Sequence, residues 1–159
     1  MNSTKKILIA NRGVIAIRAL RAAKELGYQV ASVYSTADKN LKHLKLSDEA
    51  ICIGPPDSKD SYLNEAAIVS AAELANVDGI YPGYGFLSEN AEFAEKCKNS
   101  GFKFIGPSHE IISLMGDKIQ AKNLMRQLGV PVVPGYEGPV ESKEQILSLI
   151  HISEPTRLV

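Results

Sequence analysis

The sequence predicts an α/β domain with a mainly parallel sheet, because apolar runs of strand length alternate along the chain with segments of helical period. Apolar residues make up 45% and charged residues 23% of the 159 residues, as is ordinary for one compact domain with a short extension. The 18 basic and 18 acidic residues balance, which gives the chain no electrostatic reason to bind nucleic acid or an anionic membrane. No apolar run approaches the roughly 18 residues that a membrane span needs.

The first strand and helix follow directly from this pattern. We expect a strand at residues 7–10, a break at residues 11–13, and a helix over Val14–Leu26, whose apolar residues recur on one face. Gly27 is placed to cap the end of this helix. A second strand is expected at Val30–Tyr34.

The alternation continues to about residue 107. A third strand, at Ala50–Gly54, is stopped by two prolines, and an alanine-rich helix is expected at Asn64–Ala75. A fourth strand at Gly79–Tyr81, a helix at Glu89–Asn99 and a fifth strand at Phe102–Ile105 follow.

The pattern changes after residue 107, where helices are expected in succession. They fall at about Glu110–Met115, Lys118–Leu128 and, from Ser142 to Ile150, the start of another. A Pro- and Gly-rich stretch at Gly129–Gly138 is the expected exit from the domain. We therefore divide the chain into a domain at 1–107, a helical linker and truncated continuation at 108–150, and a tail at 151–159 that we expect to be non-native or truncated.

The turn after the first strand is a potential anion site, because the N–H groups and dipole of a helix start favour negative charge. It carries a single glycine, Gly13, so the G-x-G-x-x-G of dinucleotide-binding dehydrogenases is missing. No phosphate-binding G-x-x-x-x-G-K-[ST] is present either. The alternative is a plain turn in which Arg12 and Arg18 are surface or interface charges.

The segment after the fourth strand is a second candidate, because open α/β sheets bind ligands at the carboxyl ends of their strands. Its glycines permit close backbone approach, while Tyr84 and Phe86 offer flat apolar surface. Ser88 can cap the next helix, with Glu89 in the first turn. Equally well, the aromatic side chains could fill a gap in the core.

Three further features are weaker. Asp117 can cap the helix that starts at Lys118, and a lysine at a helix start points to a nearby anion such as phosphate, although a solvated surface lysine fits as well. Asp38 fits a ribose contact or a polar loop. We expect His43 and His109 to be structural, because neither has a partner at metal-ligand spacing. We expect Cys52 and Cys97 to be reduced, packed thiols.

Several blocks, in order, resemble the biotin carboxylase family. One block after another matches over roughly residues 5–140, which makes the resemblance highly specific. The blocks are Ile9–Gly13 with Ile15–Arg18, Ser61–Asn64, Pro82–Asn90, Phe104–Pro107, Leu114–Lys118, Gly129–Pro131 and Val133–Gly135.

This resemblance implies a Rossmann-like pre-ATP-grasp domain followed by the start of the ATP-grasp region. It implies an ATP-dependent ligase that phosphorylates bicarbonate to carboxyphosphate and then transfers the carboxyl group to biotin. The implied cofactors are ATP and magnesium, with biotin as a substrate attached to a biotin carboxyl carrier protein. The implied partners are that carrier and carboxyltransferase subunits, in a homodimer when full length.

The resemblance also implies roles for individual positions. Lys118 corresponds to an ATP contact, and no catalytic residue or metal ligand falls in this sequence, since they would all follow residue 150. Val14 departs from the glutamate usual in the family. The rim of the biotin and bicarbonate pocket is implied at Tyr84, Gly85 and Phe86, and the dimer interface at Arg18, Arg21 and Glu25.

The final carboxyl acceptor stays open. We expect the cytoplasmic acetyl-CoA carboxylase type, which leads to malonyl-CoA and fatty acid synthesis, because the chain starts at this domain without a targeting segment. Propionyl-CoA or pyruvate carboxylases share the domain. The sequence is also compatible with another ATP-grasp ligase, of the carbamoyl-phosphate synthetase type, and with a non-catalytic fragment that only dimerises or docks.

Overall fold

The first apolar run forms the centre of the sheet, because it is buried on both sides. In the computed structural model, which describes residues 5–133, this run is β1 (Lys6–Ile9). Successive side chains of a strand point to opposite faces. Leu8 and Ile9 are accordingly both fully buried, in two separate apolar clusters. A strand covered on both faces is typical of a parallel sheet.

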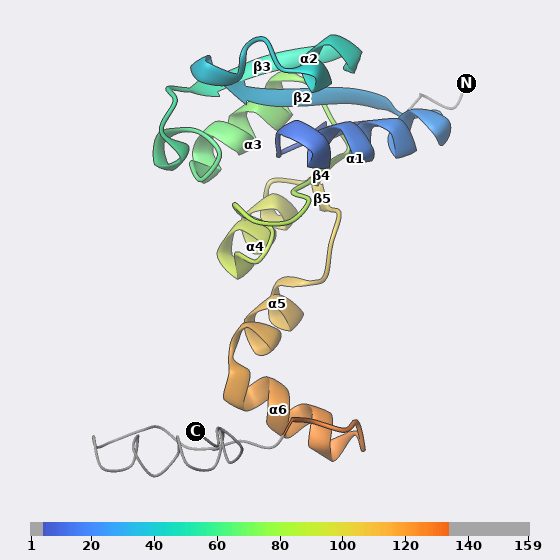
Figure 1. Ribbon diagram of the computed structural model, residues 1–159, viewed down its shortest axis with the longest axis vertical. Helices are drawn as coiled ribbons and strands as arrows, with labels where there is room; N and C mark the ends of the chain where they lie inside the picture. Colours follow the sequence, from blue (N-terminus) through green and yellow to red (C-terminus); the bar gives the residue numbers. More distant parts are fainter. Residues whose placement is uncertain (1–4, 134–159) are drawn as a thin grey trace, which may run out of the picture. The chain divides into compact units, whose positions relative to one another are not determined.

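All five strands run parallel, in the order β3-β2-β1-β4-β5, which confirms the predicted α/β class. The strands and helices alternate along the chain, as the colours of Figure 1 show. The predicted strand after residue 78 agrees to the residue, whereas the fifth strand is shorter than expected. Besides β1 the strands are β2 (Gln29–Ser35), β3 (Glu49–Gly54), β4 (Gly79–Tyr81) and β5 (Lys103–Phe104).

The helices connect these strands on both faces of the sheet. Two short 3-10 turns, at residues 36–38 and 58–60, add to them. The helices are α1 (Gly13–Glu25), α2 (Lys42–Leu46), α3 (Glu65–Leu74), α4 (Ala91–Asn99), α5 (His109–Gly116) and α6 (Lys118–Gln127).

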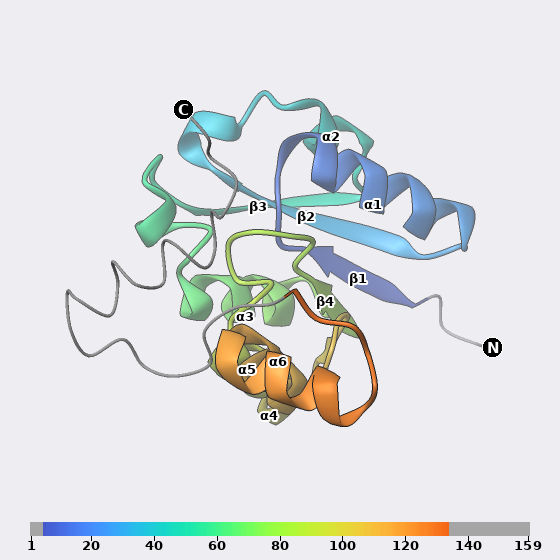
Figure 2. The same ribbon diagram turned by 60° about the horizontal axis from the view of Figure 1, so that its bottom comes forward.

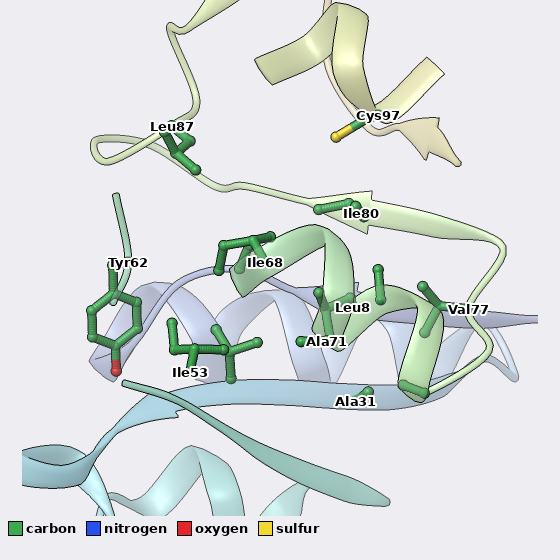
Figure 3. Close-up of a cluster of buried hydrophobic side chains, with 14 of the residues drawn as sticks. Leu8, Ala31, Ile53, Tyr62, Ile68, Ala71, Val77, Ile80, Leu87 and Cys97 are labelled. Carbon is green, nitrogen blue, oxygen red and sulfur yellow. The ribbon is translucent and has the colours of Figure 1, made fainter. Parts of the chain in front are cut away.

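Helix α1 covers one face of the sheet, and α3 and α4 cover the other (Figure 2). On the α3 side, Ile68 and Ala71 pack with Leu8 and Ile80 in the larger buried cluster (Figure 3). On the α1 side, Ile9 packs with Val30 and the small residues of the helix. The apolar stripe of each helix therefore fixes the face that it covers.

The start of α4 differs from the sequence prediction. The helix begins at Ala91, not at Glu89, and its cap is Asn90, whose side chain accepts a 2.9 Å hydrogen bond from the N–H of Phe93. Ser88 was the expected cap, but its N–H donates to the carbonyl of Gly85 and it lies within a turn. Ser88 and Asn90 both suit a helix cap, and because Ser88 lies in the turn that begins at Gly85, Asn90 caps the helix.

The end of α1 confirms its predicted cap. Gly27 has φ +77°, and its N–H donates to the carbonyl of Lys24 at 3.0 Å. The two cysteines are free, but only Cys97 is packed as predicted; Cys52 is exposed, because it points away from the clusters on an edge strand. His43 is fully buried, and its ring lies 3.4 Å from the carbonyl of Val33.

The chain divides into two compact units, of which the structure describes residues 5–113 and residues 114–133. The predicted boundary at residue 107 stays a prediction. The expected helix from Ser142 and the expected tail at 151–159 lie outside the described residues. Among residues 5–133, no helix combines the length and the apolar character that crossing a membrane requires.

Candidate ligand-binding site

The strand order changes direction between β1 and β4, which makes the carboxyl ends of these two strands a topological switch point. The chain leaves β1 for β2 on one side, and β4 pairs with β1 on the other. Connections that diverge in this way leave an opening at the carboxyl ends of the two strands, where open α/β sheets bind their ligands. The turn at residues 11–13 and the segment 82–90 meet at this edge. Both were candidates from the sequence, and the fold brings them together.

Asn11 fastens these two segments. It is fully buried, and its Nδ2 donates hydrogen bonds to the carbonyls of Pro82 at 2.7 Å and Tyr84 at 3.0 Å. Its Oδ1 accepts a 2.8 Å bond from the N–H of Arg12. The amide is thus saturated by backbone partners on both segments, as a buried polar group requires.

Gly83 lies directly against this amide. Its φ is +73°, and a Cβ added there would stand 3.0 Å from Nδ2 of Asn11 and 2.8 Å from a methyl of Ile15. Glycine meets both the conformational and the steric demand. The segment can therefore approach the start of α1 only because this position has no side chain.

Arg12 is not the free surface or interface charge that the plain-turn alternative describes. Its Nη1 donates to Oδ2 of Asp38 at 3.1 Å, and its guanidinium carbon stands 5.2 Å from the ring centre of Tyr62 and 5.6 Å from that of Phe86. Both ring distances lie within the range of cation–π attraction. The residue is held by one charge and two aromatic faces.

The structure agrees with neither interpretation of Asp38, because its carboxylate is buried and bonded to other side chains of the chain, not free for a ribose or solvated in a polar loop. It is buried, and one oxygen, Oδ2, accepts from Arg12, from the hydroxyl of Ser35 at 2.9 Å and from the phenol of Tyr62 at 2.8 Å. We call these residues, Arg12, Ser35, Asp38 and Tyr62, the Asp38 cluster.

The protonation of the cluster follows from its contacts. Burial by itself raises the pKa of Asp38, but the hydrogen bonds from Tyr62, Ser35 and Arg12 favour the carboxylate and together lower that pKa. Burial raises the pKa of Tyr62, and its bond to the carboxylate raises it further. At neutral pH the cluster therefore holds an ionised aspartate and a neutral phenol.

Two aromatic residues of the segment point in different directions. Phe86 is half-buried and stacks on Tyr62 with ring centres 4.9 Å apart and planes 17° apart. Tyr84 is 70% exposed, and Gly85 is exposed beside it. Of the two interpretations, packing in the core thus describes Phe86, while Tyr84 keeps its surface open to a ligand.

The candidate interface residues Arg18, Arg21 and Glu25 are all exposed on α1. A cavity of about 550 Å³ lies beside this helix, over the neighbouring part of the sheet. Arg18 lines it together with apolar side chains such as Ile7, Leu26 and Ile105. An arginine at the edge of an apolar hollow is suited to a protein contact.

Lys118 belongs to the second unit. Asp117 caps α6 as predicted, with Oδ1 accepting from the N–H groups of Ile119 and Gln120 at 2.9 and 3.0 Å. Lys118 is exposed in the first turn of α6, next to this carboxylate. Its approach to the segment around Tyr84 stays a prediction.

Sequence reasoning missed Asn11, Ser35 and Tyr62 as site residues. Asn11 had a usable signal, because an asparagine directly after a buried strand needs partners at the sheet edge. Tyr62 stood within a family block without an assigned role. Within residues 5–133, no group of three or more His, Cys, Asp or Glu side chains is arranged to hold a metal ion.

Comparison with protein families gives a match to "Biotin carboxylase, N-terminal domain" over residues 3–112. Among curated proteins, the chain is 59% identical to the biotin carboxylase of Haemophilus influenzae over 138 residues. That alignment covers 87% of this chain and 31% of the relative. The chain therefore spans about a third of the length of such relatives.

Solved structures agree with this match. The fold resembles a biotin carboxylase complex with β,γ-ATP from Campylobacter jejuni, with a TM-score of 0.87 and 52% identity over 94% of this chain and 33% of that one. It also resembles the biotin carboxylase domain of the Hydrogenobacter thermophilus 2-oxoglutarate carboxylase in complex with MgADP, ADP and bicarbonate. There the TM-score is 0.85 and the identity 44%, over 93% of this chain and 32% of that one.

Proposed function

The chain belongs to the family of biotin carboxylase N-terminal domains, and on that basis we propose that it forms the first part of an ATP-dependent biotin carboxylase. The complete enzyme phosphorylates bicarbonate with ATP to give carboxyphosphate and ADP. The carboxyl group then passes to a ureido nitrogen of biotin, and inorganic phosphate leaves. The observation that carries the proposal is the edge of the sheet at the ends of β1 and β4, where Asn11 joins the turn at residues 11–13 to the segment 82–86.

Within this enzyme, Tyr84, Gly85 and Phe86 form the rim of the biotin and bicarbonate pocket. The exposed ring of Tyr84 offers a flat apolar face to a planar ligand. Lys118 contacts a phosphate of ATP, because a lysine amine is a compact point charge that suits phosphate. Magnesium and the reacting groups are held by the part of a full-length enzyme that this chain does not include.

The homodimer is proposed to form through α1. Arg18, Arg21 and Glu25 are exposed on this helix, and Arg18 adjoins the apolar cavity of about 550 Å³. The neighbouring Lys24 forms an ion pair with Asp48, with 2.9 Å between Nζ and Oδ1. The charges of Arg18, Arg21 and Glu25 are proposed to contact a second copy of the chain. Arg21→Glu should shift a full-length assembly toward monomer in analytical ultracentrifugation, and an unchanged dimer would remove α1 from the interface.

We propose acetyl-CoA as the final acceptor, in the cytoplasm, with a biotin carboxyl carrier protein and carboxyltransferase subunits as partners. In support, the chain is more similar to the H. influenzae biotin carboxylase, at 59% identity, than to the 2-oxoglutarate carboxylase domain, at 44%. The test supplies a full-length enzyme that contains this chain with acetyl-CoA or with 2-oxoglutarate, each with its matching carboxyltransferase, and measures which acceptor is carboxylated.

The decisive experiment is a chimera in which residues 5–133 of this chain replace the matching part of the H. influenzae enzyme. We expect bicarbonate-dependent ATP hydrolysis and carboxylation of free biotin by the chimera, and neither by the 159-residue chain alone. Lys118→Gln in the chimera should raise the KM for ATP, while Lys122→Gln, one turn later on α6, serves as the matched control. A folded chimera without biotin carboxylation would contradict the proposal, as would turnover by the isolated chain.

A further inference from the structure

The segment at residues 83–86, which is proposed as the rim of the biotin pocket, has three residues with positive φ. Gly83 and Gly85 have φ values of +73° and +71°, and Phe86, which has a side chain, has +45°. L-residues other than glycine adopt this left-handed region at an energetic cost. Such backbone persists where its surroundings over-determine it. Something outside the segment must therefore hold it in this form.

Asn11 holds the first half of the segment. Its Nδ2 reaches the carbonyls of Pro82 and Tyr84, which flank Gly83 on either side. Both donated bonds have short distances, 2.7 and 3.0 Å, and the side chain is completely buried. Rotating the peptide planes around Gly83 would break one or both bonds inside the protein, where no water replaces them.

Arg12 holds the second half. Its guanidinium lies over the ring of Phe86 at 5.6 Å, while that ring stacks on Tyr62. The guanidinium in turn is oriented by Asp38, whose position is fixed by Ser35 and Tyr62. A continuous set of contacts therefore runs from the end of β2 to the backbone bend at Phe86.

The charge of Arg12 is already engaged. Its ion pair with Asp38 measures 3.1 Å, and the aspartate side chain is only 12% exposed. An anionic substrate would have to compete with a carboxylate inside the protein. Arg12 is therefore suited to fixing a neighbouring segment rather than to binding bicarbonate or phosphate itself.

From this geometry we infer that Asn11 and Arg12 are positioning residues for the biotin pocket. They fix the bend at residues 83–86 so that Tyr84 presents its exposed face to the planar ureido ring of biotin, and Asp38 orients Arg12. The inference rests on the proposed function for the identity of the ligand. The fixing of the segment by Asn11 and Arg12 is a property of the chain alone.

The first test uses the 159-residue chain and hydrogen exchange followed by mass spectrometry. Arg12→Leu removes the ion pair and the contact over both rings, and Asn11→Leu removes both donated bonds. Each should accelerate exchange of the Ser88 amide, whose N–H donates to the carbonyl of Gly85 at 3.0 Å, at least tenfold, with β1 and β2 unchanged. The matched controls, Lys45→Leu and Asn40→Leu, replace exposed residues and should not change it.

Asn11→Leu alters a buried site and could unfold the chain. Arg12 is only half-buried, so Arg12→Leu remains informative, and a thermal melt identifies a folded variant. Unchanged exchange of the Ser88 amide in folded Arg12→Leu overturns the role of Arg12 in fixing the segment.

The second test uses the chimera. Arg12→Leu should raise the KM for free biotin at least fivefold and should raise it more than the KM for ATP. Arg12→Lys keeps the charge but not the planar face, so its KM for biotin should lie between those of the parent and of Arg12→Leu. A KM for biotin that does not change, or an equal rise in the KM for ATP, overturns the positioning role.

The two tests separate the inference from the proposed function. If the folded parent chimera does not carboxylate biotin, the proposed function fails, and with it the assignment of biotin as the ligand. The exchange experiment on the chain then decides by itself whether Asn11 and Arg12 fix the segment.

Discussion

The phenol of Tyr62 donates a 2.8 Å hydrogen bond to the carboxylate of Asp38. The two residues are 24 positions apart and belong to different connections, one after β2 and one after β3. The same carboxylate oxygen pairs with Arg12 from the end of β1. Three connections at the carboxyl edge of the sheet are thus joined at a single buried oxygen, and this arrangement makes testable predictions.

Removing the phenol should destabilise the chain. Tyr62→Phe deletes the bond to Asp38 and the acceptor for the N–H of Ser35 at 3.2 Å, while keeping the stack on Phe86. We expect a loss of about 1–3 kcal/mol in the free energy of unfolding, since buried groups lose their partner. Chemical denaturation measures it. Tyr34→Phe, on β2, is the control, and an equal effect of both changes would contradict the prediction.

The charge of Asp38 should make stability depend on pH in acid. The pKa of Asp38 is lowered in the folded chain, so its contribution is fully present above the unfolded value, about 3.9, and is lost as the pH falls through the folded value. Asp38→Asn removes this contribution. The difference in unfolding free energy between wild type and variant should therefore shrink from pH 6 toward pH 2.

The matched control for this titration is Asp60→Asn. Asp60 is exposed in the 3-10 turn at 58–60, and its substitution should change the free energy of unfolding by less than about 0.5 kcal/mol. A gap between wild type and Asp38→Asn that stays constant across the acid range would show that the carboxylate is not the cause.

Gly83→Ala should cost more than its backbone conformation alone explains. The new Cβ meets Ile15 at 2.8 Å and Asn11 at 3.0 Å. Gly101 also has a positive φ, +83°, but an added Cβ there meets nothing within 4 Å. Thermal or chemical unfolding should therefore show an excess loss of about 1–3 kcal/mol for Gly83→Ala over Gly101→Ala, the usual cost of overpacking. An equal loss of unfolding free energy in Gly83→Ala and Gly101→Ala would contradict the close approach of Gly83 to Asn11 and Ile15.

The two thiols should differ in reactivity. Cys52 is exposed, whereas Cys97 is fully buried on α4, and burial raises the pKa of its thiol to about 12. Since the thiolate is the reactive form, a thiol reagent at pH 8 should modify Cys52 quickly and Cys97 only as the chain unfolds. Mass spectrometry after a short exposure checks this, with Cys52→Ser as the control. Rapid modification of Cys97 in the native chain would contradict its packing.

Local pattern was sufficient for the framework of the fold. The strand at Gly79–Tyr81 and the cap of α6 by Asp117 agree with the structure, because both depend on residues adjacent in sequence. The expected cap of the next helix by Ser88 is wrong, because Asn90 caps α4 instead. Both residues suit a helix cap, but Ser88 lies in a turn in which its N–H donates to the carbonyl of Gly85.

The site was only partly accessible from the sequence. The segment at Tyr84–Phe86 could be proposed from its glycines, aromatic residues and place after a strand. The Asp38 cluster could not, since Arg12, Asp38 and Tyr62 come from three separate connections and nothing local marks them as partners. From the sequence, Arg12 could be interpreted only as part of an anion site or as a surface or interface charge, and its partner Asp38 gave no local signal.

The placement of β1 beside both β2 and β4 has a consequence for synthesis of the chain. Asn11 emerges early from the ribosome, but its acceptors on Pro82 and Tyr84 are made more than 70 residues later. Until then the Nδ2 of Asn11, and the β4 side of the central strand, lack the partners that they have in the folded chain. The nascent polypeptide is therefore most exposed to misassociation in that interval, and the junction between the turn at residues 11–13 and the segment 82–86 is among the later parts of the domain to form during translation.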